Sequence, residues 1–500
     1  MSTTRPERGA AFTRRRSTRV LSGLASIGVL AGMSILAGGP AGAVTAADCG
    51  VTNTIDGTAG GTSAALQLRL DALDPVICVR GTILLTGPLT ASADVTLFGL
   101  ENAVLDGANT YRILSDGTYS RLLTVENLRF TNGRAADGAA IRALSVHTIN
   151  STFDHNVVTG DGGAIRANNV TIEGSTFESN SADGFGGGAI WFDATATVAG
   201  STFRSNTTTD RGGAIASYGV LTSVDSSTFE DNTAATNGGA IYVSVSTSIS
   251  NSTFARNSVP DVGGAVFTGT AAVVNSTFVD NTAGDWAGAI YSGRGYVTQS
   301  TFLNNSAPAG LSIWVRGGPL STFSGNIFAS TTAGRHIQDY DGAASTDLGG
   351  NIFSSAVAVE AGFVAPQAST LYGVTPATIF GASVLADNGG DVPTLALLAG
   401  SPAIDLVPAG SPVTTDARVW NRVATNDSGA FEFGAVDPAA PPPPPPPAGG
   451  GSGGALLPPT GTDVGWLATL AAGLLAVGVA FGAVSLRILR RQPRAARPRS

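Results

Sequence analysis

The sequence predicts an all-β protein whose main part is a right-handed parallel β-helix, a solenoid of short strands stacked coil upon coil. Two alternating motifs predict this fold. Phe-x-x-Asn occurs eight times, each time directly after Ser-Thr, and successive Phe residues are 24, 26, 26, 25, 24, 24 and 21 positions apart. Gly-Gly-Ala-Ile, or a near variant, lies between the copies. A period near 25 residues with two short β-like segments suits one coil of a solenoid.

The composition excludes several classes of protein. The chain has 500 residues, of which 66 are Gly and 43% are hydrophobic, so it can bury a large core and is not a disordered chain. Its many Gly and β-branched residues disfavour long helices, and no repeat unit has an apolar pattern of period 3.6. The net charge of −8 argues against nucleic-acid binding, because an acidic protein repels a polyanion.

The spacing of the motifs also predicts how their side chains are arranged. In a parallel β-helix, residues one period apart lie about 4.8 Å above one another and form columns. We therefore expect the repeated Phe to stack inside the coils and the repeated Asn to form a ladder of amide hydrogen bonds. Gly-Gly before the Ile permits a tight corner. The expected pairs are Phe153/Asn156, Phe177/Asn180, Phe203/Asn206, Phe229/Asn232, Phe254/Asn257, Phe278/Asn281, Phe302/Asn305 and Phe323/Asn326.

The regions that flank the repeats are expected to close the solenoid. The expected parts are an N-terminal cap with the first coils, the repeats, and further coils with a C-terminal cap, in residues 44–126, 127–330 and 331–436, respectively. Residues 63–73 are expected to form an amphipathic helix over the open end, which would otherwise expose strand edges. Cys49 and Cys78, the only cysteines, bracket this helix. In an exported protein we expect them to form a disulfide, with two free thiols as the alternative.

Both ends of the chain have the features of processing signals. Residues 1–43 combine an Arg-rich start, an apolar segment and Ala-Gly-Ala, the pattern of a secretory signal peptide. A run of prolines followed by a Gly-rich stretch makes residues 437–456 a semi-rigid spacer. Residues 457–500 contain Leu-Pro-Pro-Thr-Gly, an uncharged run that is long enough to form a transmembrane helix, and an Arg-rich tail.

This last arrangement resembles the cell-wall sorting signal of Gram-positive surface proteins. Its motif residues are Leu457, Pro458, Pro459, Thr460 and Gly461. The resemblance implies that a sortase thiol attacks the Thr460 carbonyl, releases the chain from Gly461 onward and joins the protein to peptidoglycan. It predicts a secreted, wall-anchored protein that meets the membrane only through the unprocessed signal. The alternative is a plain transmembrane anchor.

The repeats resemble those of polymorphic outer membrane proteins, which are defined by GGA[IVL] and FxxN, over roughly residues 127–330. That resemblance implies a β-helical surface adhesin. The series Asp387-Asn-Gly-Gly, Gly400-Ser-Pro-Ala-Ile-Asp, Thr415-Asp-Ala-Arg and Asp427-Ser-Gly-Ala-Phe-Glu is similar to the C-terminal part of bacterial choice-of-anchor Q surface proteins. We expect its Asp405, Asp416, Arg418 and Glu432 to form a buried polar network that closes the last coil, with a catalytic acid pair as the alternative.

One column carries a candidate binding surface. If the Ile of Gly-Gly-Ala-Ile points inward, the residue after it points outward, because side chains alternate along a strand. The residues at this position are Arg142, Arg166, Trp191, Ala216, Tyr242, Phe267 and Tyr291, with Trp314 next. An exposed aromatic stripe with two arginines at one end suits a glycan or a protein partner. The alternative is that a loop or the C-terminal segment covers the stripe as a second small core.

The sequence assigns no catalytic residue. Pectate-lyase-like β-helices include polysaccharide lyases and hydrolases, but the polygalacturonase motif set is absent from the sequence. Asp261 and Asp285 hold the same offset before successive motifs, so their carboxylates are expected about 5 Å apart, where Ca²⁺ would bridge them. Solvated turn aspartates are the favoured interpretation, Ca²⁺ binding by this pair is the alternative, and no other cofactor is expected.

The sequence thus favours a surface adhesin or interaction module that binds a glycan or a cell-surface protein along one face of the solenoid. A polysaccharide lyase or glycoside hydrolase on the same scaffold is the alternative. A passive stalk or coat component is a third interpretation.

Overall fold

A computed structural model describes the body of the protein. It covers residues 44–50, 53–316, 321–340, 345–355, 367–382, 384–423 and 425–438. The expected signal peptide, almost all of the spacer and the sorting signal lie outside these residues. No helix within the described part of the chain is long and apolar enough to cross a bilayer.

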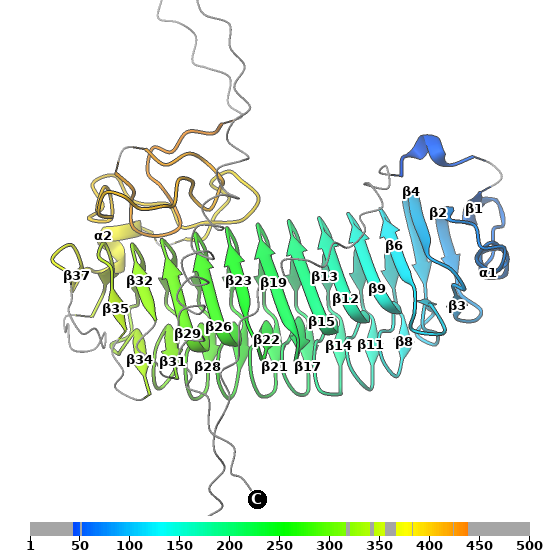
Figure 1. The fold of residues 1–500 in the computed structure, drawn as a ribbon, viewed down its shortest axis with the longest axis horizontal. Coiled ribbons are helices and arrows are strands. Elements are labelled where there is room, and N and C mark those ends of the chain that lie inside the picture. The colour runs from blue at the N-terminus through cyan, green and yellow to red at the C-terminus, as the bar shows by residue number, and fades with distance from the viewer. Residues whose placement is uncertain are drawn as a thin grey trace, which may run out of the picture. The chain divides into compact units, whose positions relative to one another are not determined.

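The described residues form a parallel β-solenoid of about 12 coils, as the sequence predicts (Figure 1). Each coil begins with a strand that runs along two faces, sometimes interrupted at the corner. These strands are β2 (Val76–Leu84), β3 (Leu89–Thr90), β4 (Val95–Asp106), β5 (Leu114–Ser115), β6 (Leu122–Glu126), β9 (Ile141–Ile149), β12 (Ile165–Glu173), β15 (Ile190–Ala199), β18 (Ile215–Ser217), β19 (Val220–Asp225), β22 (Ile241–Val243), β23 (Thr247–Ser250), β26 (Val266–Val274), β29 (Ile290–Thr298), β31 (Ile313–Val315), β32 (Thr322–Ser324), β34 (Ile337–Asp339) and β35 (Thr346–Asp347).

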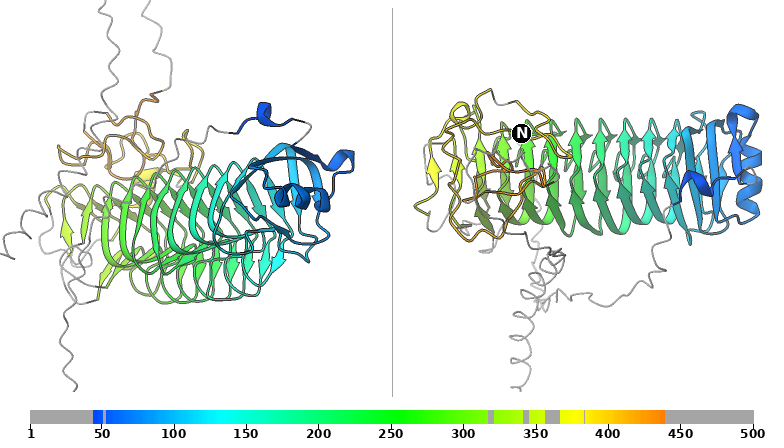
Figure 2. Two further views of the ribbon diagram at one scale, coloured as in Figure 1. Left: turned by 45° about the vertical axis from the view of Figure 1, so that its right-hand side comes forward. Right: turned by 90° about the horizontal axis from the view of Figure 1, so that it is seen from above.

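Two series of shorter strands complete the coils, except that the second halves of β2 and β4 themselves lie on the face of the first series. The first carries the repeated Phe and contains β7 (Arg129–Thr131), β10 (Thr152–Asp154), β13 (Thr176–Glu178), β16 (Thr202–Arg204), β20 (Thr228–Glu230), β24 (Thr253–Ala255), β27 (Thr277–Val279), β30 (Thr301–Leu303), β33 (Ile327–Ala329), β36 (Ile352–Phe353) and β37 (Leu371–Tyr372). The second contains β8 (Arg134–Ala135), β11 (Val157–Val158), β14 (Ser181–Ala182), β17 (Thr207–Thr208), β21 (Thr233–Ala234), β25 (Ser258–Val259) and β28 (Thr282–Ala283). Figure 2 shows the coils stacked in one direction.

The repeated Phe residues form a continuous stack inside the solenoid. From Phe130 to Phe302 the ring centroids of neighbouring coils are 4.7–5.0 Å apart, and the stack continues through Phe328 to Phe353. The Gly-Gly corner lets the coils approach closely, because a Cβ at Gly239 would lie 2.0 Å from the carbonyl oxygen of Gly264 in the next coil. At Gly238 φ is +65°, and a Cβ there would lie 2.2 Å from the carbonyl oxygen of Ile241.

The repeated Asn residues form the expected ladder. Asn232 is typical: its Nδ2 donates to the Phe203 carbonyl and to Asn257 Oδ1, while its Oδ1 accepts from the backbone N–H and the Nδ2 of Asn206. The same pattern runs from Asn156 to Asn305. Each amide therefore ties its coil to both neighbouring coils.

The last predicted pair, Phe323/Asn326, is an exception: Phe323 is buried and Asn326 Nδ2 donates to Asn351 Oδ1, but neither residue lies in the column predicted for it. Phe323 lies opposite Val297, and the ring that stacks on Phe302 is Phe328. Asn326 accepts from the backbone N–H of Ser300, so it continues the column of Ser residues that precedes the Phe column. The short step of 21 residues has moved this copy of the motif to a neighbouring position in the coil.

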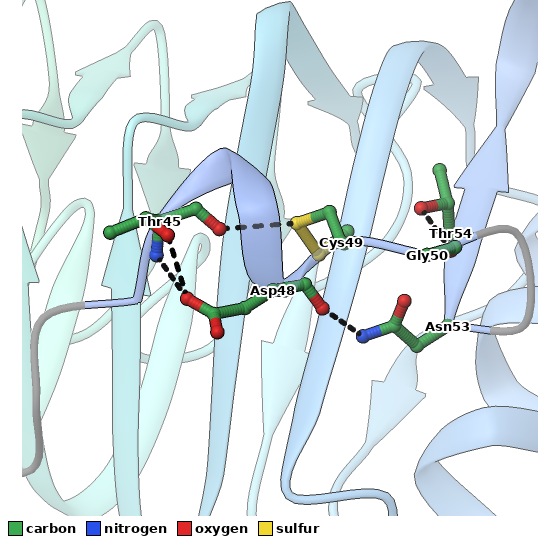
Figure 3. Close-up of a disulfide and its surroundings, with 7 residues drawn as sticks. Thr45, Asp48, Cys49, Gly50, Asn53 and Thr54 are labelled. Atoms are coloured by element: carbon green, nitrogen blue, oxygen red, sulfur yellow. Dashed lines mark hydrogen bonds between the residues drawn. A yellow bond between two sulfur atoms is a disulfide. The ribbon is translucent and has the colours of Figure 1, made fainter.

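The N-terminal end is closed as predicted. Helix α1 (Ser63–Asp71) buries Leu66 and Leu70 against the first strands. Before it come η1 (Ala46–Asp48), β1 (Thr54–Asp56) and η2 (Gly57–Ala59). Cys49 and Cys78 form a disulfide with their Cα atoms 5.8 Å apart (Figure 3). The disulfide ties the segment before the helix to β2.

A cap would stack on the end of the solenoid, but the C-terminal residues do not. After β37 and α2 (Pro376–Phe380), the chain folds back over the side of the coils (Figure 1). We name residues 376–438, apart from 383 and 424, the C-terminal clasp. Its Phe380, Leu395, Leu397 and Phe431 pack on the outward residues of β24, β27, β30 and β33. The clasp packs against this side of the coils because those outward residues are apolar.

One buried histidine gives a prediction for the pH dependence of stability. His336 lies beside the Phe stack, with Nδ1 3.2 Å from Ser312 Oγ and Nε2 3.0 Å from Ser354 Oγ. Burial lowers the pKa of His336 to about 4. In the unfolded chain this residue binds a proton near the ordinary histidine pKa of 6.5, whereas in the folded protein it stays neutral until about pH 4. It should therefore cost about 3 kcal/mol of stability as the pH falls through that window.

The test compares wild type with His336→Gln, which keeps side-chain partners for both serines. We expect the stability advantage of wild type over the variant to shrink by about 3 kcal/mol between pH 7 and pH 4 in urea titrations. The comparison is needed because burial raises the pKa of Asp427 to about 6, which has the opposite effect on both proteins. Parallel pH profiles would contradict the assignment.

Candidate binding face

The predicted outward column exists. Arg142 lies opposite Arg166, Arg166 opposite Trp191, and the series continues in register through Ala216, Tyr242, Phe267 and Tyr291 to Trp314. We name these eight residues the aromatic column. It runs along the first half of the long strands, where the preceding Ile points into the core.

The expected exposure of this column is wrong. Trp191, Tyr242, Tyr291 and Trp314 are only 3%, 8%, 8% and 7% exposed, and Phe267 is partly buried. Rings in adjacent coils cover one another: the centroids of Tyr242 and Phe267 are 5.0 Å apart, and those of Phe267 and Tyr291 are 4.9 Å apart. The column is therefore a second small core outside the coils, and turn residues provide the rest of its cover.

The side chains that cover the column are themselves aromatic. Tyr218 packs edge-on against Trp191 and Tyr242, Trp286 stacks on Trp314 with centroids 4.8 Å apart, and Tyr340 lies against Trp314. These three side chains, which we name the aromatic rim, are 51%, 40% and 65% exposed. Sequence reasoning missed them because they lie in turns and recur at no fixed period. The sequence signal for these residues was a large aromatic side chain in a turn whose other residues are small.

Charged groups accompany the column in its first coils. Arg166 Nη1 donates to Asp193 Oδ2 at 2.7 Å, and Trp191 Nε1 donates to Asp193 Oδ1 at 3.1 Å. Arg142 lies over the ring of Tyr119, with Cζ 5.0 Å from the centroid. Farther along, Arg211 lies 4.8 Å from the centroid of Tyr242. Arginine thus covers several rings of this face through cation–π contacts.

A shallow hollow lies beside the later coils of the aromatic column. It has a volume of about 360 Å³ and is lined by Gly269, Thr270, Gly293, Arg294 and Arg316. Gly269 and Gly293 stand at the corner of β26 and β29, where the lack of side chains leaves space between neighbouring coils. The hollow adds two basic side chains to the same flank of the solenoid.

Asp261 and Asp285 lie in adjacent coils with their side chains in contact. The backbone N–H of Asp285 donates to the Asp261 carbonyl at 2.9 Å. Burial, and next the neighbouring carboxyl of Asp285, raise the pKa of Asp261. Among the described residues, no three His, Cys, Asp or Glu side chains are grouped as a metal site. Calcium binding by this pair stays a hypothesis.

The polar residues of the C-terminal series do come together, but inside the clasp and not at the last coil. Arg418 donates to Asp416 at 2.6 and 2.8 Å, and Arg422 donates to Glu432 at 2.7 Å. Asp416 and Glu432 are both fully buried and paired with arginine, an arrangement that holds the clasp together. Asp405 takes part only through its backbone N–H, which donates to Asp427.

Comparison with known proteins agrees with the stacked coils described above. The family model for the right-handed β-helix region matches residues 111–283, which include β5 to β28. No curated protein and no solved structure matches the chain. Residues 111–283 are therefore a right-handed β-helix region, and their stacked coils make it a β-solenoid.

Proposed function

We propose that this protein is a secreted, wall-anchored surface module that binds a glycan along the face formed by the aromatic rim. The exported location is supported by the Cys49–Cys78 disulfide, because disulfides persist in oxidising compartments outside the cytoplasm. The anchoring is supported by the LPPTG motif and the apolar and Arg-rich segments that follow it. A polysaccharide lyase or hydrolase on the same scaffold is the competing proposal.

The observation that carries the binding proposal is the aromatic rim itself. Tyr218, Trp286 and Tyr340 keep large exposed areas while their rings pack on a buried aromatic column. A ring that is fixed from behind loses little conformational entropy when it binds, and exposed aromatic surface is a common platform for the faces of sugars. Because the rim follows the axis of the solenoid, it suits an extended chain better than a small molecule.

The test replaces two of the three rim residues and leaves the residues of the column unchanged. We expect Tyr218→Ala with Trp286→Ala to weaken binding of a polysaccharide about thirtyfold, the loss typical of two central aromatic contacts. The melting temperature should fall by no more than about 4 °C, because Tyr218 and Trp286 are 51% and 40% exposed and lie outside the main core. Binding is measured by calorimetry against a panel of neutral and acidic polysaccharides, with reducing and unsaturated ends assayed in the same samples.

Tyr296→Ala is the matched control, since Tyr296 is 37% exposed but lies in the second half of β29, away from the rim. This control should bind like wild type. Equal binding by the rim variant and wild type would refute the proposed face. Accumulation of cleaved ends would replace the binding proposal with an enzyme.

A further inference from the structure

Arg142 lacks the carboxylate partner that several arginines of the repeats have. Arg166 pairs with Asp193, Arg204 with Glu178 and Arg129 with Asp154. The guanidinium of Arg142 makes no hydrogen bond or ion pair with another described residue, and its contact is the ring of Tyr119. It is half-buried at the start of the aromatic column, so its donors are partly shielded from water without a protein acceptor.

The neighbours of Arg142 are also positive. Arg112 is held by its Nε and Nη2, which donate to the carbonyls of Asp137 and Gly138. Burial, and next the charge of Arg142, lower the pKa of Arg112, so the two guanidinium groups lie near enough to repel each other. Arg166 occupies the same position one coil farther on. Arg166 is already paired with Asp193, whereas Arg112 and Arg142 have no carboxylate partner among the described residues, so an anion between these two would reduce their repulsion.

The site is held in place by a turn. The carboxylate of Asp116 is buried and accepts from the backbone N–H groups of Tyr119, Ser120 and Arg121, which fixes the turn after β5. Tyr119 reaches across the coils and donates its hydroxyl to Asp193 at 3.4 Å. Burial raises the pKa of Tyr119 to about 12, so the hydroxyl keeps its proton at neutral pH. Arg142 is thus presented by a preformed frame.

We propose that Arg142, with Arg112 beside it and Tyr119 beneath it, forms a subsite for an anionic group, a carboxylate or a sulfate, of a polysaccharide. The planar fork of a guanidinium matches such groups. This inference rests on the proposed function and names the class of glycan. The coil of Tyr218 lies three coils beyond that of Arg142, about 14 Å at the spacing of stacked strands. One extended acidic chain can therefore contact both the subsite and the rim.

The experiment measures the binding of hyaluronan (carboxylate), dextran sulfate (sulfate) and dextran (neutral) to the purified protein. We expect Arg142→Gln to weaken binding of at least one anionic polymer about tenfold or more, and Arg142→Lys to recover part of that loss. Arg204→Gln is the matched control, because Arg204 is an ion-paired arginine on another face of the coil. It should bind like wild type. Melting temperatures of all variants show that they are folded.

The outcomes separate this inference from the function on which it rests. Loss of binding confined to the hyaluronan arm identifies a carboxylate subsite, and loss confined to dextran sulfate identifies a sulfate subsite. If wild type and Arg142→Gln bind every polymer equally while the rim variant does not, the anion subsite is refuted and the binding face stands. If wild type binds none of the three polymers, the subsite is refuted together with the glycan proposal.

Discussion

Replacing Asn232 by Leu is expected to lower the free energy of unfolding by about 3–6 kcal/mol. The side chain is fully buried and joins three coils through its amide. Leu has a similar volume but makes none of these bonds. The backbone N–H and Nδ2 of Asn206 would lose their acceptor, and Asn257 Oδ1 would lose a donor. A buried polar group left without its partner costs about 1–3 kcal/mol.

Chemical denaturation monitored by circular dichroism measures this loss. Asn168→Leu is the matched control, because Asn168 is half-buried in β12 and makes no side-chain hydrogen bond to another described residue. The control should change stability by less than about 0.5 kcal/mol. Equal effects of the two substitutions would mean that the ladder contributes no more than ordinary packing.

The second large effect is expected in the clasp, where Arg422→Leu should cost about 3–5 kcal/mol. Arg422 and Glu432 are both buried, and the arginine also donates to Asn275 Oδ1 at 3.1 Å on the side of the coils. Removing the arginine leaves a buried carboxylate without its partner charge, which is the expensive way to break a buried ion pair. The clasp should then open locally, so hydrogen exchange should accelerate in residues 384–438 and not in the Phe stack.

The double variant Arg422→Leu/Glu432→Leu provides the control. It removes both charges, so it should recover a substantial part of the stability that the single variant loses. A double variant as unstable as Arg422→Leu would show that the arginine acts through its contacts with the coils and not by neutralising Glu432.

The sequence predicted the coils because the physics of stacking requires a repeat. A Phe column and an Asn ladder need identical residues one coil apart, so the length of a coil can be read directly from the sequence. The assignment of Phe323 failed for the same reason: a step of 21 residues cannot close a coil in the register set by steps of 24 to 26. The Phe-x-x-Asn motif is present there, but its residues occupy other positions in the coil.

Exposure was harder to predict than register. Alternation correctly turned Tyr242 and Tyr291 away from the main core, but it said nothing about Tyr218 and Trp286, which cover them from irregular turns. Arg142 was predicted to lie in the column, yet its lack of an ionic partner depends on where the side chains of Arg112 and Tyr119 lie. Neither follows from spacing.

The docking area of the clasp did leave a signal in the sequence. The residue after the repeated Phe is charged in the earlier coils and apolar in the later ones. The series is Asp154, Glu178, Arg204, Glu230, Ala255, Val279 and Leu303. The change occurs where the clasp begins to cover the coils. The repeats alone therefore indicate which coils are covered by another segment, although they do not identify that segment.

The uniform amide ladder has a consequence for how such a protein can change in evolution. From Asn156 to Asn281 each coil makes the same bonds to the next, so duplication or deletion of one whole repeat in this stretch leaves every remaining amide with an equivalent neighbour. Contacts unique to one place, the disulfide at one end and the clasp at the other, restrict such changes to the coils between them. Each gained repeat would move the Arg142 subsite about 4.8 Å farther from the clasp. The reach of the molecule is thus adjustable in steps of one coil.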